Sequence, residues 1–326
     1  MAEKSAKLSI CIPTWNRSNF LQKTLSILAG QIETDQLGDQ VEICISDNGS
    51  TDDTPSVIGR IVDENPNLRI SVVRFPENQG FSINMDAAVR LASGEFVFLL
   101  GDDDLFVPRG VVDLLKVCLG FDADTLVILN LKNADCSSEW RKTASSQDVI
   151  FQDVRESLMQ LGKFHPTFIG NFIFRRTAYL QHFHPRFLHS IYPHTAVWFE
   201  IMRGKRVHFR NLSCLEVDDS DRRIGDCQAR ATAVDMARIQ TEGHLRHQGG
   251  QIENLLFYSV NLRSIPRAVL LERSGLCKGK RGTYSDLRVR NLVNCYNGST
   301  LAIACAVSIA LASRLVPKWL LRVILR

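Results

Sequence analysis

The first hundred residues alternate short apolar runs with longer segments in which apolar residues recur every three or four positions. The runs are typical of buried parallel strands, and the spaced pattern is typical of helices that pack one face on a sheet. Strands are predicted at 8–12, 41–46, 69–75 and 95–100. Helices are predicted through Leu21, Leu25 and Leu28, over 54–62 and over 81–92. This alternation predicts an α/β fold with a mostly parallel sheet flanked by helices.

A polar segment follows each of these four predicted strands. The segments are Pro13-Thr14-Trp15-Asn16-Arg17, Asp47 to Asp53, Pro76 to Gly80, and Asp102-Asp103-Asp104. Right-handed crossovers bring the carboxyl ends of parallel strands to one edge of a sheet, where open α/β sheets bind ligands. We therefore expect Thr14, Asp47, Asn78 and the three aspartates to lie at the same edge.

The three consecutive aspartates are the first candidate for chemistry. Clustered carboxylates at the end of a strand are suited to Mg²⁺ or Mn²⁺, which bind phosphate beside one or two carboxylates. The triplet could equally be a solvated acidic turn that caps the next helix. The triplet alone leaves both interpretations open.

Taken together, the four segments give the chain a resemblance to a known family. In its motifs Pro13 to Arg17, Ser46 to Asp52, Asn78-Gln79-Gly80 with Asn84, and Gly101 to Asp104 with Pro108, it resembles the family 2 glycosyltransferases. Their nucleotide-sugar domain is the Rossmann-like GT-A fold. The motifs cover roughly residues 7–110. Tyr192-Pro193-His194 and the basic, hydrophobic end of the chain also resemble the bacterial O-antigen transferases of the abequosyltransferase-like group.

The resemblance implies a nucleotide-sugar donor and assigns residues to it. The implied donor-binding residues are Pro13, Thr14, Asn16, Arg17, Asp47, Asn78, Gly80, Asn84 and Asp102. Asp47 matches the aspartate that bonds the base, because a carboxylate accepts from a ring or exocyclic N–H. Arg17 could instead be a surface charge. Where the family often has Ala-Arg-Asn, this chain has Ser82-Ile83-Asn84, so that position offers no arginine to the diphosphate.

The resemblance also implies a Mg²⁺ or Mn²⁺ cofactor held by Asp103 and Asp104. Gly101 occupies the first place of the family's common Asp-x-Asp-Asp motif, and Asp102 could substitute for the missing acid. A metal is needed because the sugar nucleotide leaves as a diphosphate, whose developing charge a cation offsets.

A base that deprotonates the acceptor hydroxyl is expected near the start of a later helix, since inverting family members carry an acid there. Here His194 precedes a helical pattern over 195–202, and an imidazole can accept a proton at neutral pH. His194 could instead hydrogen-bond without titrating. Glu200 and the later Asp218, Asp219 and Asp221 are weaker candidates.

Composition is that of a globular protein, with 45% hydrophobic and 23% charged residues and nine cysteines among 326 residues. The cysteines form no Cys-x-x-Cys pair, which favours a reducing compartment. The polar segment from Met1 to Lys7 lacks the apolar core of a secretory signal, so we expect the catalytic part in the cytoplasm.

The last fifth of the chain, from residue 261, is basic and then amphipathic. An apolar run over 301–312 is followed by Arg314, Lys318, Arg322 and Arg326, which lie on one helical face. Residues 299–326 are expected to bind an anionic membrane surface, peripherally on the inner face of the cell membrane. The apolar run would make a helix of about 20 Å, too short for a bilayer core of about 30 Å. Packing against the enzyme is the alternative, and nucleic-acid binding is not expected.

Together these expectations predict a domain organisation and a function. Residues 1–125 form the nucleotide-sugar-binding GT-A half, 126–260 the acceptor-binding half of the same domain, and 261–326 a basic linker with amphipathic membrane-associating helices. We expect metal-dependent, inverting transfer of a hexose or deoxyhexose to a glycan or polyprenyl-diphosphate-linked saccharide in cell-surface polysaccharide synthesis. A nucleotidyltransferase on a similar fold and a non-catalytic nucleotide-sugar-binding scaffold are the alternatives.

Overall fold

A computed structural model of the chain describes a large part of its first 217 residues. The described residues are 6–120, 127–129, 132–133, 148–154, 156–157, 168–190, 192–210 and 212–217, together with 305 and 309. The basic linker over 261–290, the proposed membrane-binding faces, and Asp218, Asp219 and Asp221 lie outside the described residues.

Four parallel strands form the first half of the sheet, in the order β3-β2-β1-β4. They are β1 (Leu8–Thr14), β2 (Val41–Asp47), β3 (Arg69–Arg74) and β4 (Phe96–Leu99). β1 pairs with β2 in step, from Leu8 opposite Val41 to Thr14 opposite Asp47. This register carries Thr14 and Asp47 to the same edge of the sheet.

Four further strands extend this sheet beyond β4, so that it has eight strands in the order β3-β2-β1-β4-β9-β6-β10-β8. They are β6 (Val127–Leu129), β8 (Val149–Phe151), β9 (Phe172–Arg175) and β10 (Val207–Arg210). β9 runs antiparallel to β4 and to β6. A separate small sheet joins β5 (Leu105–Phe106), β11 (Leu215–Val217) and β7 (Lys132–Asn133). The observed fold is therefore α/β with a sheet that is mostly parallel, as predicted.

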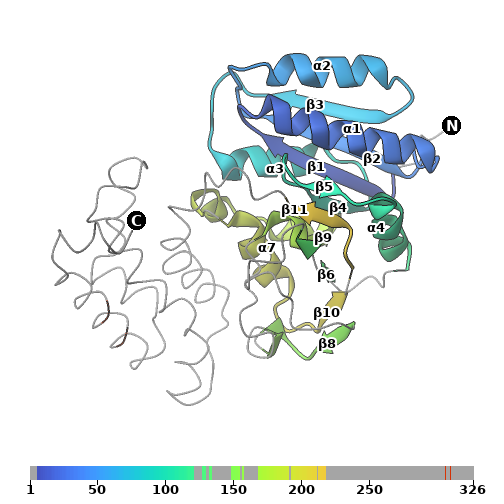
Figure 1. Cartoon of the computed structure of the whole chain (residues 1–326). Helices are drawn as coiled ribbons and strands as arrows, with labels where there is room; N and C mark the ends of the chain where they lie inside the picture. Colours follow the sequence, from blue (N-terminus) through green and yellow to red (C-terminus); the bar gives the residue numbers. More distant parts are fainter. Residues whose placement is uncertain are drawn as a thin grey trace, which may run out of the picture.

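Helices cover both faces of the large sheet (Figure 1). α1 (Ser18–Thr34), α2 (Thr54–Glu64) and α4 (Gly110–Leu119) pack on one face, and α3 (Phe81–Leu91), α6 (Arg176–His182) and α7 (Pro193–Ile201) pack on the other. The strand residues divide by alternation, with Ile10 and Ile12 toward α1 and Cys11 toward α3. Every residue of β1, β2 and β4 is buried, because these strands are covered on both faces.

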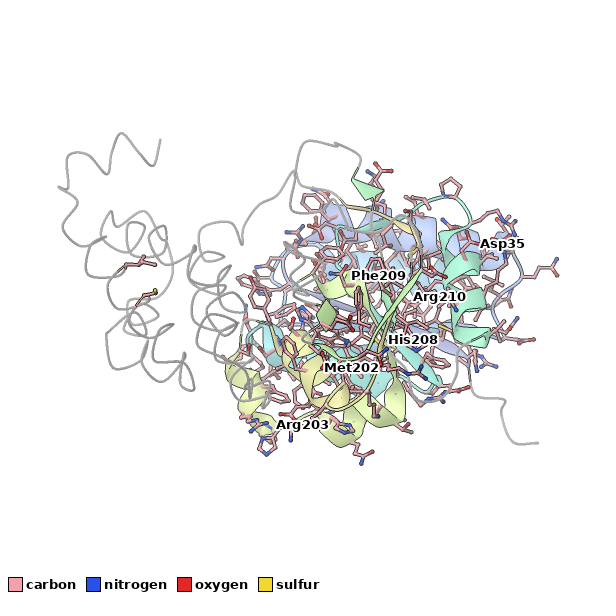
Figure 2. All side chains as sticks on the ribbon, turned by 90° about the horizontal axis from the view of Figure 1, so that it is seen from below. Asp35, Met202, Arg203, His208, Phe209 and Arg210 are labelled. Carbon is pink, nitrogen blue, oxygen red and sulfur yellow. The ribbon has the colours of Figure 1, made fainter. Side chains whose placement is uncertain are left out.

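Buried residues also alternate with more exposed ones on β10, near the other end of the sheet. On β10, Val207 and Phe209 are buried whereas Arg210 is exposed. Figure 2 labels His208, Phe209 and Arg210, three successive residues of this strand. Among the described residues, no helix has both the length and the apolar character needed to cross a membrane.

Two elements of the second half begin in a way that the sequence pattern does not show. A 3₁₀ turn, η2 (Ile169–Asn171), precedes β9, which begins only at Phe172. Helix α7 starts at Pro193, so His194 lies inside its first turn instead of before it. Proline suits that first position, because it has no N–H to leave unpaired and its φ angle is already helical.

Candidate active site

The loops after β1 and β2 are joined at the carboxyl edge of the sheet by Asn16. Its backbone is left-handed, with a φ of 51°, a conformation that asparagine tolerates. Its side-chain oxygen accepts the backbone N–H of Thr51 at 2.7 Å, and its own N–H donates to the Ser50 hydroxyl at 2.9 Å. Asn16 thus sets the shape of the expected donor site by joining two of its loops.

Asp47 ends β2 as a fully buried carboxylate. One oxygen accepts the backbone N–H of Ser50 at 2.9 Å, and the other lies 3.1 Å from Nε of Arg74. Arg74 also donates to the Ser50 carbonyl at 2.9 Å, and its side chain is 55% exposed. Sequence reasoning missed Arg74, although its place as the last residue of β3 put it at this edge.

The loop after β3 is held against the loop after β2 by two asparagines. Asn48 donates to the side-chain oxygen of Asn78 at 3.0 Å and accepts the N–H of Gln79 at 2.8 Å. Gly80 follows with a φ of 92°, a conformation that favours glycine, and α3 begins directly after it. Asn78 and Gly80 therefore lie beside the end of β2, as expected.

Asn84 lies below this surface, on the inner side of α3. It is 2% exposed, donates to the Thr14 carbonyl at 3.1 Å and accepts the Ser46 hydroxyl at 2.6 Å. It ties α3 to the ends of β1 and β2. Through these contacts Asn84 stabilises the ends of the strands that carry Thr14 and Asp47.

Arg17 joins the loop after β1 to the aspartates after β4. Its Nε lies 2.9 Å from Asp102, and its Nη2 lies 2.5 Å from Asp103. The second oxygen of Asp102 accepts the Thr14 hydroxyl at 2.7 Å. The Arg17 side chain is only 12% exposed, and its guanidinium lies over the Phe20 ring at 4.4 Å. Arg17 is therefore a partner of the acids and not a surface charge.

The third aspartate is more deeply buried than the second, and its position explains the glycine in the motif. Asp104 is 2% exposed, whereas the Asp103 side chain is 23% exposed. A Cβ added at Gly101 would collide with the Asp104 carboxylate and come within 3.1 Å of Asp103. Glycine at position 101 therefore leaves the space that the Asp104 side chain fills. Thr24 on α1 fixes the turn by donating to the Asp102 carbonyl at 3.0 Å.

The arrangement of Asp102 and Asp103 fits a divalent cation. Both carboxylates already converge on one cationic group, the guanidinium of Arg17, which stands where a metal would be attracted. Within the described residues no cluster of three or more His, Cys, Asp or Glu side chains forms a complete cage. Mg²⁺ and Mn²⁺ do not need one, because they use one or two carboxylates and take further oxygens from phosphate and water. Asp102 and Asp103 are the residues whose contacts suit such an ion, and the metal role expected of Asp104 stays a prediction.

His194 lies on α7, in an aromatic cluster of the second half. Its side chain is 2% exposed, and its ring centroid lies 5.7 Å from that of Phe172 and 6.1 Å from that of Tyr192. The preceding loop is joined to the donor side, since the Ser82 hydroxyl on α3 donates to the Ser190 carbonyl at 2.7 Å. His194 therefore follows a loop that contacts the helix after Gly80.

Two charged side chains of the second half, the candidate Glu200 and Arg175, already have ion-pair partners. Glu200 pairs with Arg186 at 2.6 Å and with Arg203 at 2.9 Å. Arg175 stands opposite Phe96, the first residue of β4, and pairs with Glu95 at 2.5 Å. It thus lies at the opposite edge of the sheet from the aspartates, where it does not face a phosphate bound by them.

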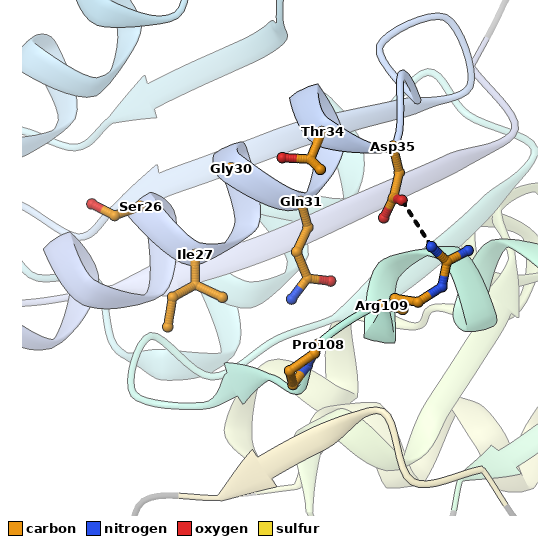
Figure 3. A pocket seen from close by; sticks show the side chains of 8 residues that line it. All are labelled: Ser26, Ile27, Gly30, Gln31, Thr34, Asp35, Pro108 and Arg109. Carbon is orange, nitrogen blue, oxygen red and sulfur yellow. Dashed lines mark hydrogen bonds and ion pairs between the residues drawn. The ribbon is translucent and has the colours of Figure 1, made fainter.

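A cavity of about 410 Å³ lies between the second half of α1 and the start of α4 (Figure 3). It is lined by Ser26, Ile27, Gly30, Gln31, Thr34, Asp35, Pro108 and Arg109. Arg109 pairs with Asp35 across it at 3.3 Å. None of the residues assigned to donor, metal or proton transfer lines this cavity, so it is separate from the candidate site.

Parts of known sugar transferases are similar to this chain in sequence. Abequosyltransferase RfbV of Salmonella typhimurium is 33% identical over 129 residues, which are 40% of this chain and 37% of that protein. GalNAc(5)-diNAcBac-PP-undecaprenol beta-1,3-glucosyltransferase of Campylobacter jejuni is 35% identical over 110 residues, 34% of each chain. The matches thus span little more than a third of these relatives.

Solved structures share the fold over most of the chain. Mannosyltransferase PcManGT from Pyrobaculum calidifontis, in complex with GDP-Man and Mn²⁺, superimposes with a TM-score of 0.58 over 95% of this chain and 88% of that one, at 17% identity. The fold is accordingly that of the GT-A glycosyltransferases. A sequence profile described as glycosyl transferase family 2 matches residues 9–183, more than half of the chain. The chain therefore belongs to glycosyl transferase family 2.

Proposed function

We propose that the protein transfers a sugar from a nucleotide-diphosphate donor to a saccharide acceptor, with Mg²⁺ or Mn²⁺ as cofactor and with inversion at the anomeric carbon. One observation carries the proposal: Thr14, Asp47, Asn78 and Asp102–Asp103 meet at the carboxyl edge of the parallel strands. Open α/β sheets bind ligands at this edge. The Mn²⁺ and GDP-Man in the mannosyltransferase structure support the choice of ligands.

In this proposal the donor lies across the ends of β1, β2 and β4. The Asp47 carboxylate and the Arg74 guanidinium form a buried acceptor and an exposed donor side by side, which suits the polar edge of a base. Gly80 lets the donor approach the backbone closely, because no side chain projects there. Asp102 and Asp103 hold the metal, which would neutralise the departing diphosphate when bound.

His194 is the proposed acceptor of the proton from the attacking hydroxyl. An imidazole nitrogen can accept a proton from a hydroxyl, and the loop before His194 contacts α3 through Ser82 and Ser190. Its burial sets a geometric condition, since the hydroxyl must reach the ring at a face that Phe172 and Tyr192 leave open. Glu200 is the poorer candidate, because two arginines already pair with its carboxylate.

We also propose a lipid-linked acceptor in cell-surface polysaccharide synthesis, reached from the cytoplasmic side of the membrane. The support is the undecaprenol-linked substrate in the name of the Campylobacter jejuni relative and the basic, apolar pattern of residues 299–326. Such a tail would bring the catalytic part to an acceptor that cannot leave the bilayer. Flotation with anionic and neutral vesicles tests this, using a variant with Arg314, Lys318, Arg322 and Arg326 changed to Gln. Equal flotation of both proteins would contradict it.

The transferase proposal is tested by incubating the purified protein with a panel of nucleotide sugars, a lipid-linked saccharide extract and Mg²⁺ or Mn²⁺. Release of nucleoside diphosphate from one donor, lost with EDTA and in Asp103→Asn, is the expected result. Asp113→Asn is the matched control, because Asp113 lies on α4, is 46% exposed and pairs only locally with Lys116. Release of pyrophosphate from a nucleoside triphosphate would indicate a nucleotidyltransferase instead. Donor binding without turnover would indicate a scaffold.

A further inference from the structure

We propose that Arg17 is an exchangeable counter-cation of the site. It holds Asp102 and Asp103 together in the absence of metal and moves to the diphosphate of the donor when a divalent cation binds those acids. The inference rests on the proposed function, because it takes the donor to be a nucleotide diphosphate. It assigns to one side chain both the assembly of the metal site and the binding of the leaving group.

The first observation is that Arg17 occupies the oxygens that a metal would need. Its Nε lies 2.9 Å from Oδ1 of Asp102 and its Nη2 lies 2.5 Å from Oδ2 of Asp103, while Thr14 occupies the other Asp102 oxygen. All three charged side chains are largely buried, with exposed fractions of 12%, 10% and 23%. Two cations a few ångströms apart in such surroundings repel strongly. A metal on these carboxylates therefore has to displace the guanidinium.

The second observation is that the site needs a cation for the diphosphate and that Arg17 is placed to supply it. Residues 82–84, which follow Gly80, are Ser, Ile and Asn and carry no positive charge. Arg74 is held at the base end by Asp47 and the Ser50 carbonyl. The guanidinium of Arg17 stands at the metal end, where the phosphates must lie to share the ion. Its planar fork matches phosphate oxygens as well as carboxylates.

The third observation is that the backbone at Arg17 is held in place independently of its guanidinium. The Arg17 backbone N–H donates to the Thr54 hydroxyl at 3.3 Å, and the neighbouring Asn16 is fixed to the β2 loop. The guanidinium itself lies over the Phe20 ring, 4.4 Å from its centroid. A cation–π contact has little directional preference across the ring face, so the guanidinium can turn without losing it. The loop can therefore stay in place while the charged group turns from the carboxylates to the donor.

The exchange predicts that metal and diphosphate bind cooperatively, because each favours the same position of Arg17. Couplings of this kind typically change affinity by about 5- to 150-fold, and they are reciprocal. Removing the positive charge of Arg17 should abolish the competition between its guanidinium and the metal for Asp102 and Asp103. Arg17→Gln should bind Mn²⁺ alone about tenfold more tightly than the unmodified protein, because the repulsion between guanidinium and metal is gone. It should bind diphosphates more weakly and lose most of the coupling.

The test measures Mn²⁺ binding to the full chain by electron paramagnetic resonance of the unbound ion, first with Mn²⁺ alone and then with UDP, GDP, CDP or dTDP. Arg109→Gln is the charge-matched control, since Arg109 pairs with Asp35 at the cavity between α1 and α4. Tighter Mn²⁺ binding in Arg17→Gln, with the control unchanged, supports the exchange. Binding that is equal to or weaker than that of the unmodified protein overturns it.

Arg17→Lys keeps the test decisive if the glutamine variant does not fold. Lysine retains the charge, but its ammonium cannot bridge the two carboxylates as a fork does. Mn²⁺ alone should then bind more tightly than to the unmodified protein, though by less than with glutamine; no gain overturns the exchange. Mn²⁺ binding is measured without any sugar transfer, so this test is independent of the test of the transferase. A silent donor screen with a shift in metal affinity would refute only the transferase, and an active enzyme without that shift would refute only the exchange.

Discussion

Glu42 offers a quantitative test of how the sheet edge opposite the candidate site is held together. This β2 residue is 6% exposed and links β1 and β2 to the connection between α3 and β4. Its Oε1 accepts the Ser9 hydroxyl at 2.5 Å, the Ser93 N–H at 2.6 Å and the Gly94 N–H at 2.9 Å. Its Oε2 accepts the Ser93 hydroxyl at 2.8 Å. One carboxylate thus accepts the backbone N–H groups of Ser93 and Gly94, which lie outside the strands.

These contacts allow two substitutions to be ranked. In Glu42→Gln the carbonyl oxygen can keep the three Oε1 contacts, and the amide can donate to the Ser93 hydroxyl. Only the strengthening from charge is lost, for which we expect a cost of about 1–2 kcal/mol. Glu42→Ala removes all four of these hydrogen bonds, although the Gly94 N–H keeps the Ser9 hydroxyl oxygen at 2.9 Å as a second acceptor. A typical hydrogen bond contributes about 0.5–1.5 kcal/mol, so we expect a cost of about 2–4 kcal/mol in the free energy of unfolding.

Urea unfolding at pH 7 measures both costs, with Glu64→Gln and Glu64→Ala as controls. Glu64 is exposed at the end of α2, and its substitution should cost less than about 0.5 kcal/mol. The reasoning would be refuted if Glu42→Ala cost less than about 1 kcal/mol, or if both Glu42 variants cost the same.

The pH dependence gives an independent check on Glu42. Burial by itself raises the pKa of this carboxyl, but the hydrogen bonds from Ser9, Ser93 and Gly94 outweigh burial and hold the pKa below its ordinary 4.5. A lowered pKa in the folded protein contributes stability above the unfolded pKa, and this contribution is lost as pH falls through the folded pKa. Unfolding measured from pH 6 to pH 3 should therefore show a smaller loss of stability in Glu42→Gln than in the unmodified protein.

Three further predictions concern the candidate site. Asp47→Asn keeps the shape but removes the charge that pairs with Arg74, so the nucleotide Kd should rise by about tenfold or more in calorimetry, since a charge-assisted bond is lost; an unchanged Kd would argue against base recognition by Asp47. Gly101→Ala places a Cβ on the Asp104 carboxylate and should lower the unfolding free energy by about 1–3 kcal/mol and weaken Mn²⁺ binding, whereas no change in either would show that the turn has room. His194→Gln should slow transfer by about 100-fold or more, because the base is lost; turnover near that of the unmodified protein would exclude His194 as the base.

Sequence reasoning located the site through the ends of strands. Asp47 and Asp102 are far apart in the chain, yet each follows a buried strand, and parallel pairing in register brings such ends together. The Thr14 hydroxyl does bond Asp102, and Asn48 does bond Asn78. What each residue does to a donor stays a prediction.

The partners of these residues were not predictable in the same way. Arg17 could be read as a surface charge or a donor contact, and only the fold shows its guanidinium between Asp102 and Asp103. Arg74 was missed, because an arginine at the end of a strand has no distinctive pattern. Gly101 looked like a missing acid, whereas the structure shows a space that the Asp104 side chain uses.

The sequence by itself determined the class of fold and the edge at which the chemistry gathers. It could do so because the period of apolar residues and the order of strands and helices are local properties, and because parallel topology follows from their alternation. The tertiary structure alone decided which charges pair and which polar side chains are buried, such as Asn84 beneath Thr14 and His194 among aromatic rings. Pairing and burial depend on side-chain directions between segments distant in the chain, and no local pattern encodes those directions.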